Sequence, residues 1–169
     1  ALGHDVTLST IQLDYMLPER FELTYVDENG EKQRPVVIHR AILGSLDRFI
    51  AFLLEETKGN LPLWLAPKQV VVLPVNTNYQ GEYAKEVAAR LRKEGFRVDV
   101  DCRDEKLGYR IREAQIHKIP YELVLGNNER DNDTVTYRLY GQQKQTTVPY
   151  TEFVDLLKKE VLDKTLSNH

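Results

Sequence analysis

The N-terminal part of the chain alternates between short apolar runs and polar turns, as β-strands do. Strand-like patterns cover residues 6–14, 21–26 and 35–40. Between the second and third of these segments lies Asn29-Gly30, a dipeptide typical of hairpin turns. The pattern therefore predicts an antiparallel hairpin that is preceded by a third strand.

A helix is expected over residues 45–57, directly after these strands. Its apolar positions recur at the three- and four-residue spacing of a single helix stripe, which we expect to be buried. They are Leu46, Phe49, Ile50, Leu53 and Leu54. Arg48 lies off the centre of this stripe, in the first turn, where a positive charge opposes the helix dipole. We therefore expect Arg48 to have an anionic partner.

The pattern changes further along the chain, where strands and helices alternate. The apolar run 69–75 is typical of a buried strand, a helical pattern then ends at Gly95, and residues 96–101 alternate as a second strand. A second helix is expected over 107–118 and a third strand over 121–126. The last expected elements are a hairpin around Gly141 and a helix over 151–164 that faces inward through Phe153, Val154, Leu157, Val161 and Leu162. We predict a mixed sheet with helices on both faces.

A change in composition separates the two patterns. Gly59, Pro62 and Pro67 punctuate the segment between them, as is typical of a linker. We place a domain boundary near Leu65. The first domain, residues 1–65, is expected to be an antiparallel sheet with a helix, and the second domain covers residues 66–169.

Composition narrows the setting. The chain has 169 residues, 41% of them hydrophobic, and a formal net charge of -3, which excludes a generally basic nucleic-acid coat but leaves room for a local basic patch. The single cysteine, Cys102, cannot form an internal disulfide, so the cytoplasm is the expected compartment. No apolar run reaches the roughly 18 residues of a membrane span, and no secretory signal is present. Because the chain lacks an initiator methionine, we expect a piece of a longer protein.

Positive charge gathers in residues 103–118, which hold five basic and three acidic side chains. Tyr109 adds a stacking surface, and Arg138 lies on a later expected strand. Such a surface suits RNA, because cations position phosphates while aromatic rings and hydrogen bonds read unpaired bases. A solvated helix with internal ion pairs explains the same residues, and residue types alone favour that second interpretation.

Familiar catalytic motifs are absent. The chain has no phosphate-binding P-loop, no dinucleotide-binding glycine motif, no zinc-protease motif and no nucleophile elbow. His39 lies in an apolar strand just before Gly44 and Ser45. A lone histidine on a strand is more often a hydrogen-bonded core residue than a zinc ligand, and both interpretations stay open.

Four stretches, in order, resemble threonyl-tRNA synthetases, and together they cover most of the chain. They read TIQLDYMLPERFELTY, RPVVIHRAILGSLDRFIAFLLEE, LPLWLAPKQVVV and VDCRDEKLGYRIREAQIHKIPYELVLG. The resemblance implies an α/β chain with two parts. The first part is a partial antiparallel catalytic sheet of a class II synthetase with the motif 3 helix. The second part is an α/β/α anticodon-binding domain with a mixed five-stranded sheet.

The resemblance assigns roles in the first part. LGSLDRF matches the third signature motif of class II synthetases, so Arg48 is the catalytic arginine that binds ATP, beside room left by Gly44 and Ser45. His39 is expected to be one of three zinc ligands, with Gln12 in the same pocket. The full-length enzyme is expected to use ATP with magnesium and one zinc ion. For this fragment we expect no bound cofactor and no activity of its own.

In the second part the resemblance implies a surface that faces the anticodon of threonine tRNA. We expect its side chains to lie on one face, with carboxylates that accept hydrogen bonds from bases. They are Arg103, Asp104, Lys106, Arg112, Lys118, Glu129 and Arg138.

The implied function is the anticodon-reading part of a ligase that joins threonine to its tRNA with ATP. We expect threonine tRNA as partner, threonine and ATP as substrates of the full-length enzyme, a full-length homodimer, and a fragment that is a monomer or weak dimer. A free-standing RNA-binding or regulatory module is one alternative. A sister class II synthetase, specific for proline, glycine or histidine, is another.

Overall fold

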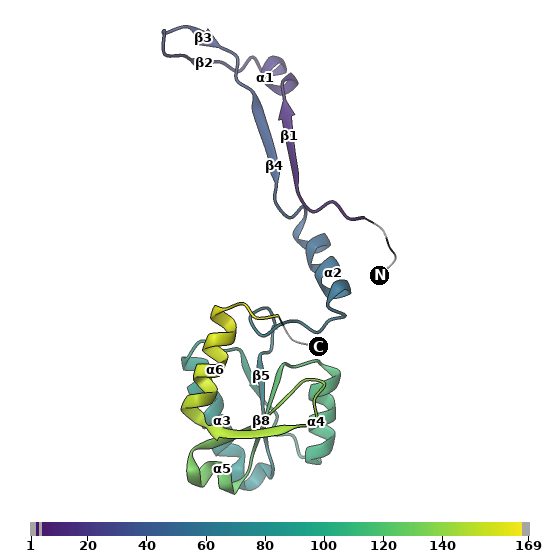
Figure 1. Ribbon diagram of the computed structural model, residues 1–169, viewed down its shortest axis with the longest axis vertical. Coiled ribbons are helices and arrows are strands. Elements are labelled where there is room, and N and C mark those ends of the chain that lie inside the picture. The colour runs from purple at the N-terminus through teal and green to yellow at the C-terminus, as the bar shows by residue number, and fades with distance from the viewer. Residues whose placement is uncertain (1–2, 4, 167–169) are drawn as a thin grey trace. The chain divides into compact units, whose positions relative to one another are not determined.

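The computed structural model describes residues 3 and 5–166. They fall into two compact units that divide between Lys58 and Gly59 (Figure 1). The side chain of Leu63 already packs in the core of the second unit. A functional domain boundary near Leu65 stays a prediction.

The first unit is built on a two-stranded antiparallel ladder. Strand β1 (Thr10–Asp14) pairs with β4 (Val37–Ala41), and Gln12 lies directly opposite His39. A short helix, α1 (Met16–Arg20), and a separate hairpin of β2 (Tyr25–Val26) and β3 (Lys32–Gln33) connect the two strands (Figure 1).

The predicted hairpin turn is confirmed, but its predicted pairing is wrong. Gly30 adopts a positive φ of 81°, and the carboxylate of Asp27 accepts hydrogen bonds from the backbone N–H groups of Asn29 and Glu31, each at 2.9 Å. The strand over 35–40, however, pairs with β1 and not with residues 21–26. Local turn chemistry fixes the turn, whereas the choice of partner strand depends on contacts that are distant in sequence.

Helix α2 (Leu46–Glu56) forms where the sequence predicts it. The hydroxyl of Ser45 caps it by accepting a hydrogen bond from the backbone N–H of Arg48 at 3.4 Å. Its apolar stripe is not buried, contrary to expectation: no residue of α2 is buried, and the side chain of Leu46 is 68% exposed. The described residues of the first unit offer no partner that covers this stripe.

The second unit contains the predicted mixed five-stranded sheet, in the order β6-β5-β7-β8-β9. The first three strands in that order are parallel, and β8 and β9 run antiparallel to their neighbours. The strands are β5 (Val70–Pro74), β6 (Val98–Val100), β7 (Tyr121–Leu125), β8 (Thr134–Leu139) and β9 (Gln145–Pro149).

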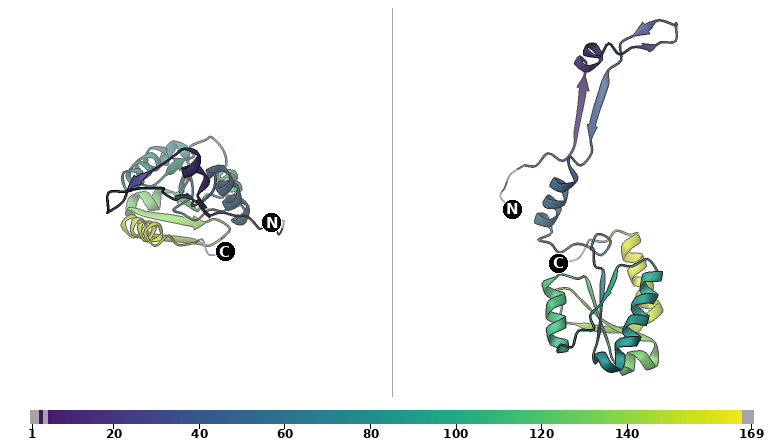
Figure 2. Two further views of the ribbon diagram at one scale, coloured as in Figure 1. Left: turned by 90° about the horizontal axis from the view of Figure 1, so that it is seen from above. Right: turned by 180° about the vertical axis from the view of Figure 1, so that it is seen from behind.

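Helices cover both faces of this sheet, as predicted (Figures 1 and 2). Val70 and Val72 face α3 (Thr77–Lys93) and α6 (Tyr150–Leu162), whereas Val71 and Leu73 face α4 (Leu107–Ile116). Because successive strand residues point to opposite faces, the valine run of β5 serves both core layers.

Two details of the second unit differ from the sequence prediction. A short helix, α5 (Asn127–Asn132), follows β7 and was not predicted. In α6, Phe153, Val154 and Leu157 are buried as expected, but Leu162 is 81% exposed because the helix ends there. Among residues 3 and 5–166, no helix is both long and apolar enough to cross a membrane.

Candidate functional site

The β1–β4 ladder brings together two residues that the sequence assigned to one pocket. Gln12 and His39 are directly opposite each other, so their side chains leave the same face of the ladder. His39 also contacts Asp14, with 3.0 Å between Nε2 and Oδ2. The backbone N–H of Leu17, and to a smaller extent His39, hold the pKa of Asp14 below its ordinary value.

This geometry leaves one histidine nitrogen for a metal. Since Nε2 faces Asp14, Nδ1 of His39 is the nitrogen that can act as a ligand. The described part of the chain contains no cluster of three or more His, Cys, Asp or Glu side chains that could hold a metal. A protein zinc site needs at least three such ligands, so these residues do not form one by themselves.

The turn that precedes α2 presents Arg48. Gly44 has a φ of 66°, a conformation in which a side chain is strained, and Ser45 then caps the helix. The guanidinium of Arg48 forms no hydrogen bond or ion pair with any other described residue. The anionic partner expected from the sequence is therefore not found within residues 3 and 5–166.

Arg103 lies at the carboxyl end of β6, where it is held by a carboxylate. Its Nε and Nη2 donate to the two oxygens of Asp101 at 2.9 and 2.7 Å, and these contacts lower the pKa of Asp101. Its guanidinium lies 5.9 Å from the ring centroid of Tyr109. Both Arg103 and Asp101 line a hollow of about 330 Å³ between β6 and α4.

One cation of the basic segment is not available to a ligand. Arg110 is 1% exposed, and its guanidinium donates to the backbone carbonyls of Pro74, Asp101 and Glu105. It ties the ends of β5 and β6 to the start of α4. Counting charges along the sequence cannot separate this structural arginine from its exposed neighbours.

A second polar group lies on the α4 side of strand β8. Glu129, on α5, accepts hydrogen bonds from the N–H of Gly126 at 2.8 Å and the hydroxyl of Thr136 at 2.7 Å. Arg138 follows Thr136 by two residues on β8, so both side chains are on the same face. Glu129 and Arg138 therefore border one open stretch of this face.

Helix α4 lies between the Arg103–Asp101 pair and the group formed by Glu129 and Arg138. Gln115 reaches toward β8, where its Oε1 accepts a hydrogen bond from the N–H of Gly141 at 2.9 Å. Arg112 is exposed one helical turn earlier and so lies on that same flank of α4. Asp104 and Lys106 are exposed in the loop before α4, and Lys118 lies past its far end, beside Gly59.

The expected single face is only partly observed. Arg112, Glu129 and Arg138 lie toward β8, Arg103 lies on the β6 side of α4, and Lys118 lies at the opposite end of the helix. The structure also adds two residues that the sequence analysis missed, Glu122 on β7 and Gln115 on α4. The signal for Glu122 was present, because it is the one charged residue in the apolar run of β7.

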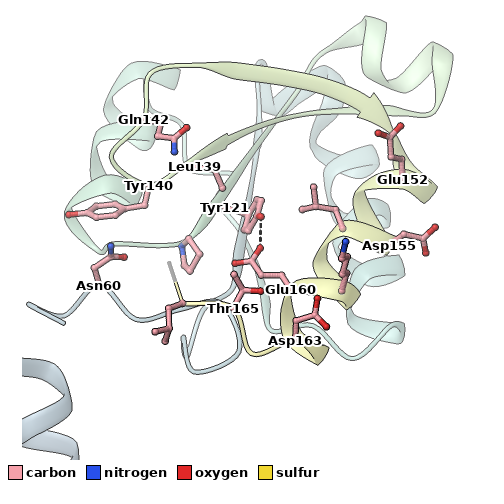
Figure 3. Close-up of a pocket in the computed structure, with 14 residues that line it drawn as sticks. Asn60, Tyr121, Leu139, Tyr140, Gln142, Glu152, Asp155, Glu160, Asp163 and Thr165 are labelled. Atoms are coloured by element: carbon pink, nitrogen blue, oxygen red, sulfur yellow. Dashed lines mark hydrogen bonds between the residues drawn. The ribbon is translucent and has the colours of Figure 1, made fainter. Parts of the chain in front are cut away.

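A hollow beside α6 has the wrong charge for RNA. It measures about 660 Å³ and lies on the sheet face opposite α4 (Figure 3). Tyr121 and Leu139 contribute to its apolar lining, and the hydroxyl of Tyr121 donates to Glu160 at 2.6 Å. Its charged lining includes Lys159, three carboxylates of α6, which are Glu152, Asp155 and Glu160, and the carboxylate of Asp163, which caps the end of α6. We call this hollow the acidic groove. Its negative charge repels phosphates, so an RNA ligand is favoured on the α4 side instead.

Two family profiles match the chain in succession. The profile described as "tRNA synthetase class II core domain (G, H, P, S and T)" matches residues 1–57, and the "Anticodon binding domain" profile matches residues 69–160. The chain therefore belongs to the anticodon binding domain family, joined to a class II synthetase core segment.

Relatives that are similar to the chain along nearly its whole length are threonine–tRNA ligases. The chain is 52% identical to a threonine–tRNA ligase of Oceanobacillus iheyensis over 98% of its own length, and 56% identical to that of Bacillus velezensis over 91%. It covers only 26% and 24% of those relatives, about a quarter of their length.

A solved structure agrees with this assignment. The RNA binding domain of a threonyl-tRNA synthetase from Cryptosporidium parvum Iowa II is 40% identical, with a TM-score of 0.84. The match covers 94% of this chain and 40% of the other. The resemblance to threonyl-tRNA synthetases and the fold predicted from the sequence are confirmed.

Proposed function

We propose that the chain reads the anticodon of threonine tRNA as part of an enzyme that ligates threonine to that tRNA with ATP. The observation that carries the proposal is the identity of 52–56% to threonine–tRNA ligases over more than nine tenths of the chain. The α4 side of the second unit supports it, because exposed cations, an aromatic ring and acceptor groups occur together there.

The residues of this surface have distinct roles. Arg112 and Lys106 position phosphates through charge, Lys118 adds positive charge at the far end of α4, and Tyr109 next to Arg103 offers a face for stacking. Glu129, with Asp104, supplies acceptors for base amino and imino groups, and Arg138 donates to base edges or phosphates. Base selectivity then comes from the acceptors and affinity from the cations.

The first unit contributes to threonine activation in this proposal. Arg48 binds the triphosphate and adenine of ATP, and Gly44 with Ser45 leaves room for the nucleotide at the start of α2. The class II core profile implies use of ATP. Magnesium accompanies ATP in the proposed reaction, where it would neutralise phosphate charge.

For zinc, we propose that this chain supplies one ligand of a site whose other ligands lie elsewhere in the longer enzyme. His39 offers a single nitrogen ligand, with Asp14 orienting the ring and Gln12 beside it. The further ligands that zinc requires are not among the described residues. We also propose a cytoplasmic homodimer for the longer enzyme and a monomer or weak dimer for this chain.

Titration with threonine tRNA tests the proposed RNA surface. We expect binding that weakens with salt, and an Arg112→Gln variant whose log–log salt slope is smaller by about 1, because one phosphate contact is lost. Fluorescence anisotropy with labelled tRNA measures both quantities.

The matched control is Lys93→Gln, which removes an exposed charge from α3 on the other side of the sheet and should leave binding unchanged. A threonine tRNA with an exchanged anticodon should bind at least about tenfold more weakly, which corresponds to one lost base contact. Equal affinity for the two tRNAs would refute anticodon reading.

A further inference from the structure

A carboxylate is buried under the proposed RNA surface. Glu122 lies on β7, directly opposite Arg138 in the β7–β8 ladder, and its exposed fraction is 0%. Opposed residues of an antiparallel pair point to the same face, so Glu122 and Arg138 both face the α4 side. RNA cannot reach Glu122 itself, because no part of it is exposed.

The carboxylate of Glu122 is only half satisfied by hydrogen bonds. Its Oε1 accepts a hydrogen bond from the side-chain amide of Gln115, whereas Oε2 has no hydrogen-bond partner among the described residues. The nearest cation to Oε2 is Arg138, with its Nε at 4.0 Å. In a poorly hydrated site, attraction between these two charges is stronger than it would be in water.

The guanidinium of Arg138 forms a hydrogen bond through Nε but none through its terminal nitrogens within the described residues. Its Nε donates to the carbonyl of Gln142 at 2.6 Å and is also the nitrogen nearest Glu122. The two terminal nitrogens, Nη1 and Nη2, have no hydrogen-bond partner within the described residues. The same Gln115 that binds Glu122 also accepts from the N–H of Gly141, so it fixes the turn that carries Gln142.

Gln115, Glu122 and the carbonyl of Gln142 thus form one network of contacts around the guanidinium of Arg138. We propose that Glu122 is a positioning residue that orients Arg138, so that the terminal nitrogens of Arg138 face the bound RNA. This inference rests on the proposed function, since it assigns Arg138 to the RNA surface. Glu122 acts through Arg138 and touches no RNA.

If Glu122 served mainly to stabilise the fold, removal of its charge should lower the thermal stability of the chain; if it positions Arg138, stability need not fall. Burial raises the pKa of Glu122, against the lowering effects of Gln115 and Arg138, so the folded chain disfavours its ionised form. The ionised carboxylate therefore costs stability at neutral pH, and this cost disappears when acid protonates the folded and unfolded chains alike.

The test is a double-mutant cycle in the full chain. Glu122→Gln keeps the shape and the acceptor for Gln115, but it turns an amide toward Arg138 and removes the attraction. We expect the affinity for threonine tRNA to fall roughly three- to tenfold, a coupling typical of neighbouring residues. The thermal midpoint should stay equal or rise.

The second arm of the cycle uses Arg138→Ala. If Glu122 acts through Arg138, adding Glu122→Gln to Arg138→Ala should weaken tRNA binding no further. An equal additional loss in both backgrounds, or a lower thermal midpoint for Glu122→Gln alone, would overturn the positioning role. A full affinity in Arg138→Ala would show that Arg138 is outside the RNA surface and would also overturn the positioning role, whereas the proposed function itself fails only if the tRNA with the exchanged anticodon binds equally well.

A third readout needs no RNA. Nitrogen-15 relaxation of the Arg138 Nε–H group reports how rigidly the guanidinium is held. The order parameter should be lower in Glu122→Gln than in the native chain. An unchanged order parameter would contradict the inference whatever the binding data show.

Discussion

Arg110 shows how differently neighbouring arginines are used in one helix. It is buried and donates to three backbone carbonyls, whereas Arg112, two residues later, is exposed. Successive helix residues are turned by about 100°, so a separation of two positions is enough to exchange the core for solvent. The local charge of the segment therefore overstates the cations that a ligand can meet.

Replacing Arg110 by Met should lower the free energy of unfolding by about 3 kcal/mol or more, because three buried carbonyls lose their donor. Urea denaturation measures this change. The same substitution at the exposed Arg112 should change stability by less than about 0.5 kcal/mol. A similar effect at both positions would contradict the role of Arg110 as a tie between strands.

The candidate site was predicted only partly, and the reason lies in single residues. Resemblance to a family supplied Glu129, which charge patterning alone would not have selected, whereas Arg138 was already a candidate from the basic residues of the chain. Glu122 was missed because a strand residue reveals its partner only once the register with β8 is known. The sequence shows that position 122 is a glutamate, but its neighbour on β8 is known only from the strand pairing.

At the scale of elements, local sequence rules predicted most helices and strands well, but they did not predict which strands pair. The valine run of β5, the end of α3 before Gly95 and the cap of α2 at Ser45 all follow from nearby residues. The pairing of β4 with β1 does not. The exposed stripe of α2 has the same cause, since periodicity shows which side of a helix is apolar and not what covers it.

Two glycines test whether backbone conformation defines the ends of helices. Gly95 follows α3 with a φ of 93°, and nothing lies within 4 Å of an added Cβ. Gly95→Ala should therefore destabilise the second unit by about 1 kcal/mol through backbone strain alone.

Gly108 is the matched control, because it is also free of neighbours within 4 Å but lies inside α4. Gly108→Ala should stabilise the chain by about 0.5 kcal/mol, since alanine loses less entropy in a helix. Thermal unfolding of both variants measures the pair. Effects of the same sign would show that strain at Gly95 is not the cause.

At the scale of the whole molecule, the two units differ in how much they bury. Apolar side chains from Leu63 to Leu157 form the cores of the second unit. In the described part of the first unit only Pro18 is buried, while Ile11, Leu13 and Ile38 are exposed. Since burial of apolar surface is the main source of stability, cooperative folding should be confined to the second unit.

Hydrogen exchange followed by mass spectrometry checks this expectation in the full chain. Peptides covering β5 and β7 should exchange slowest, and those covering β1 and β4 at least about a hundredfold faster, because their hydrogen bonds open without a core to hold them. Equal protection in the two units would show that surface left exposed here is covered in solution, for example by self-association.

The acidic groove makes the charge around α6 locally negative. Carboxylates of α6 lie on one side of the five-stranded sheet, and the exposed arginines and lysines around α4 lie on the other. Repulsion from the groove disfavours encounters in which a polyanion meets this part of α6 first, and attraction by the cations around α4 favours encounters there. Added salt shortens the distance over which this repulsion and attraction act.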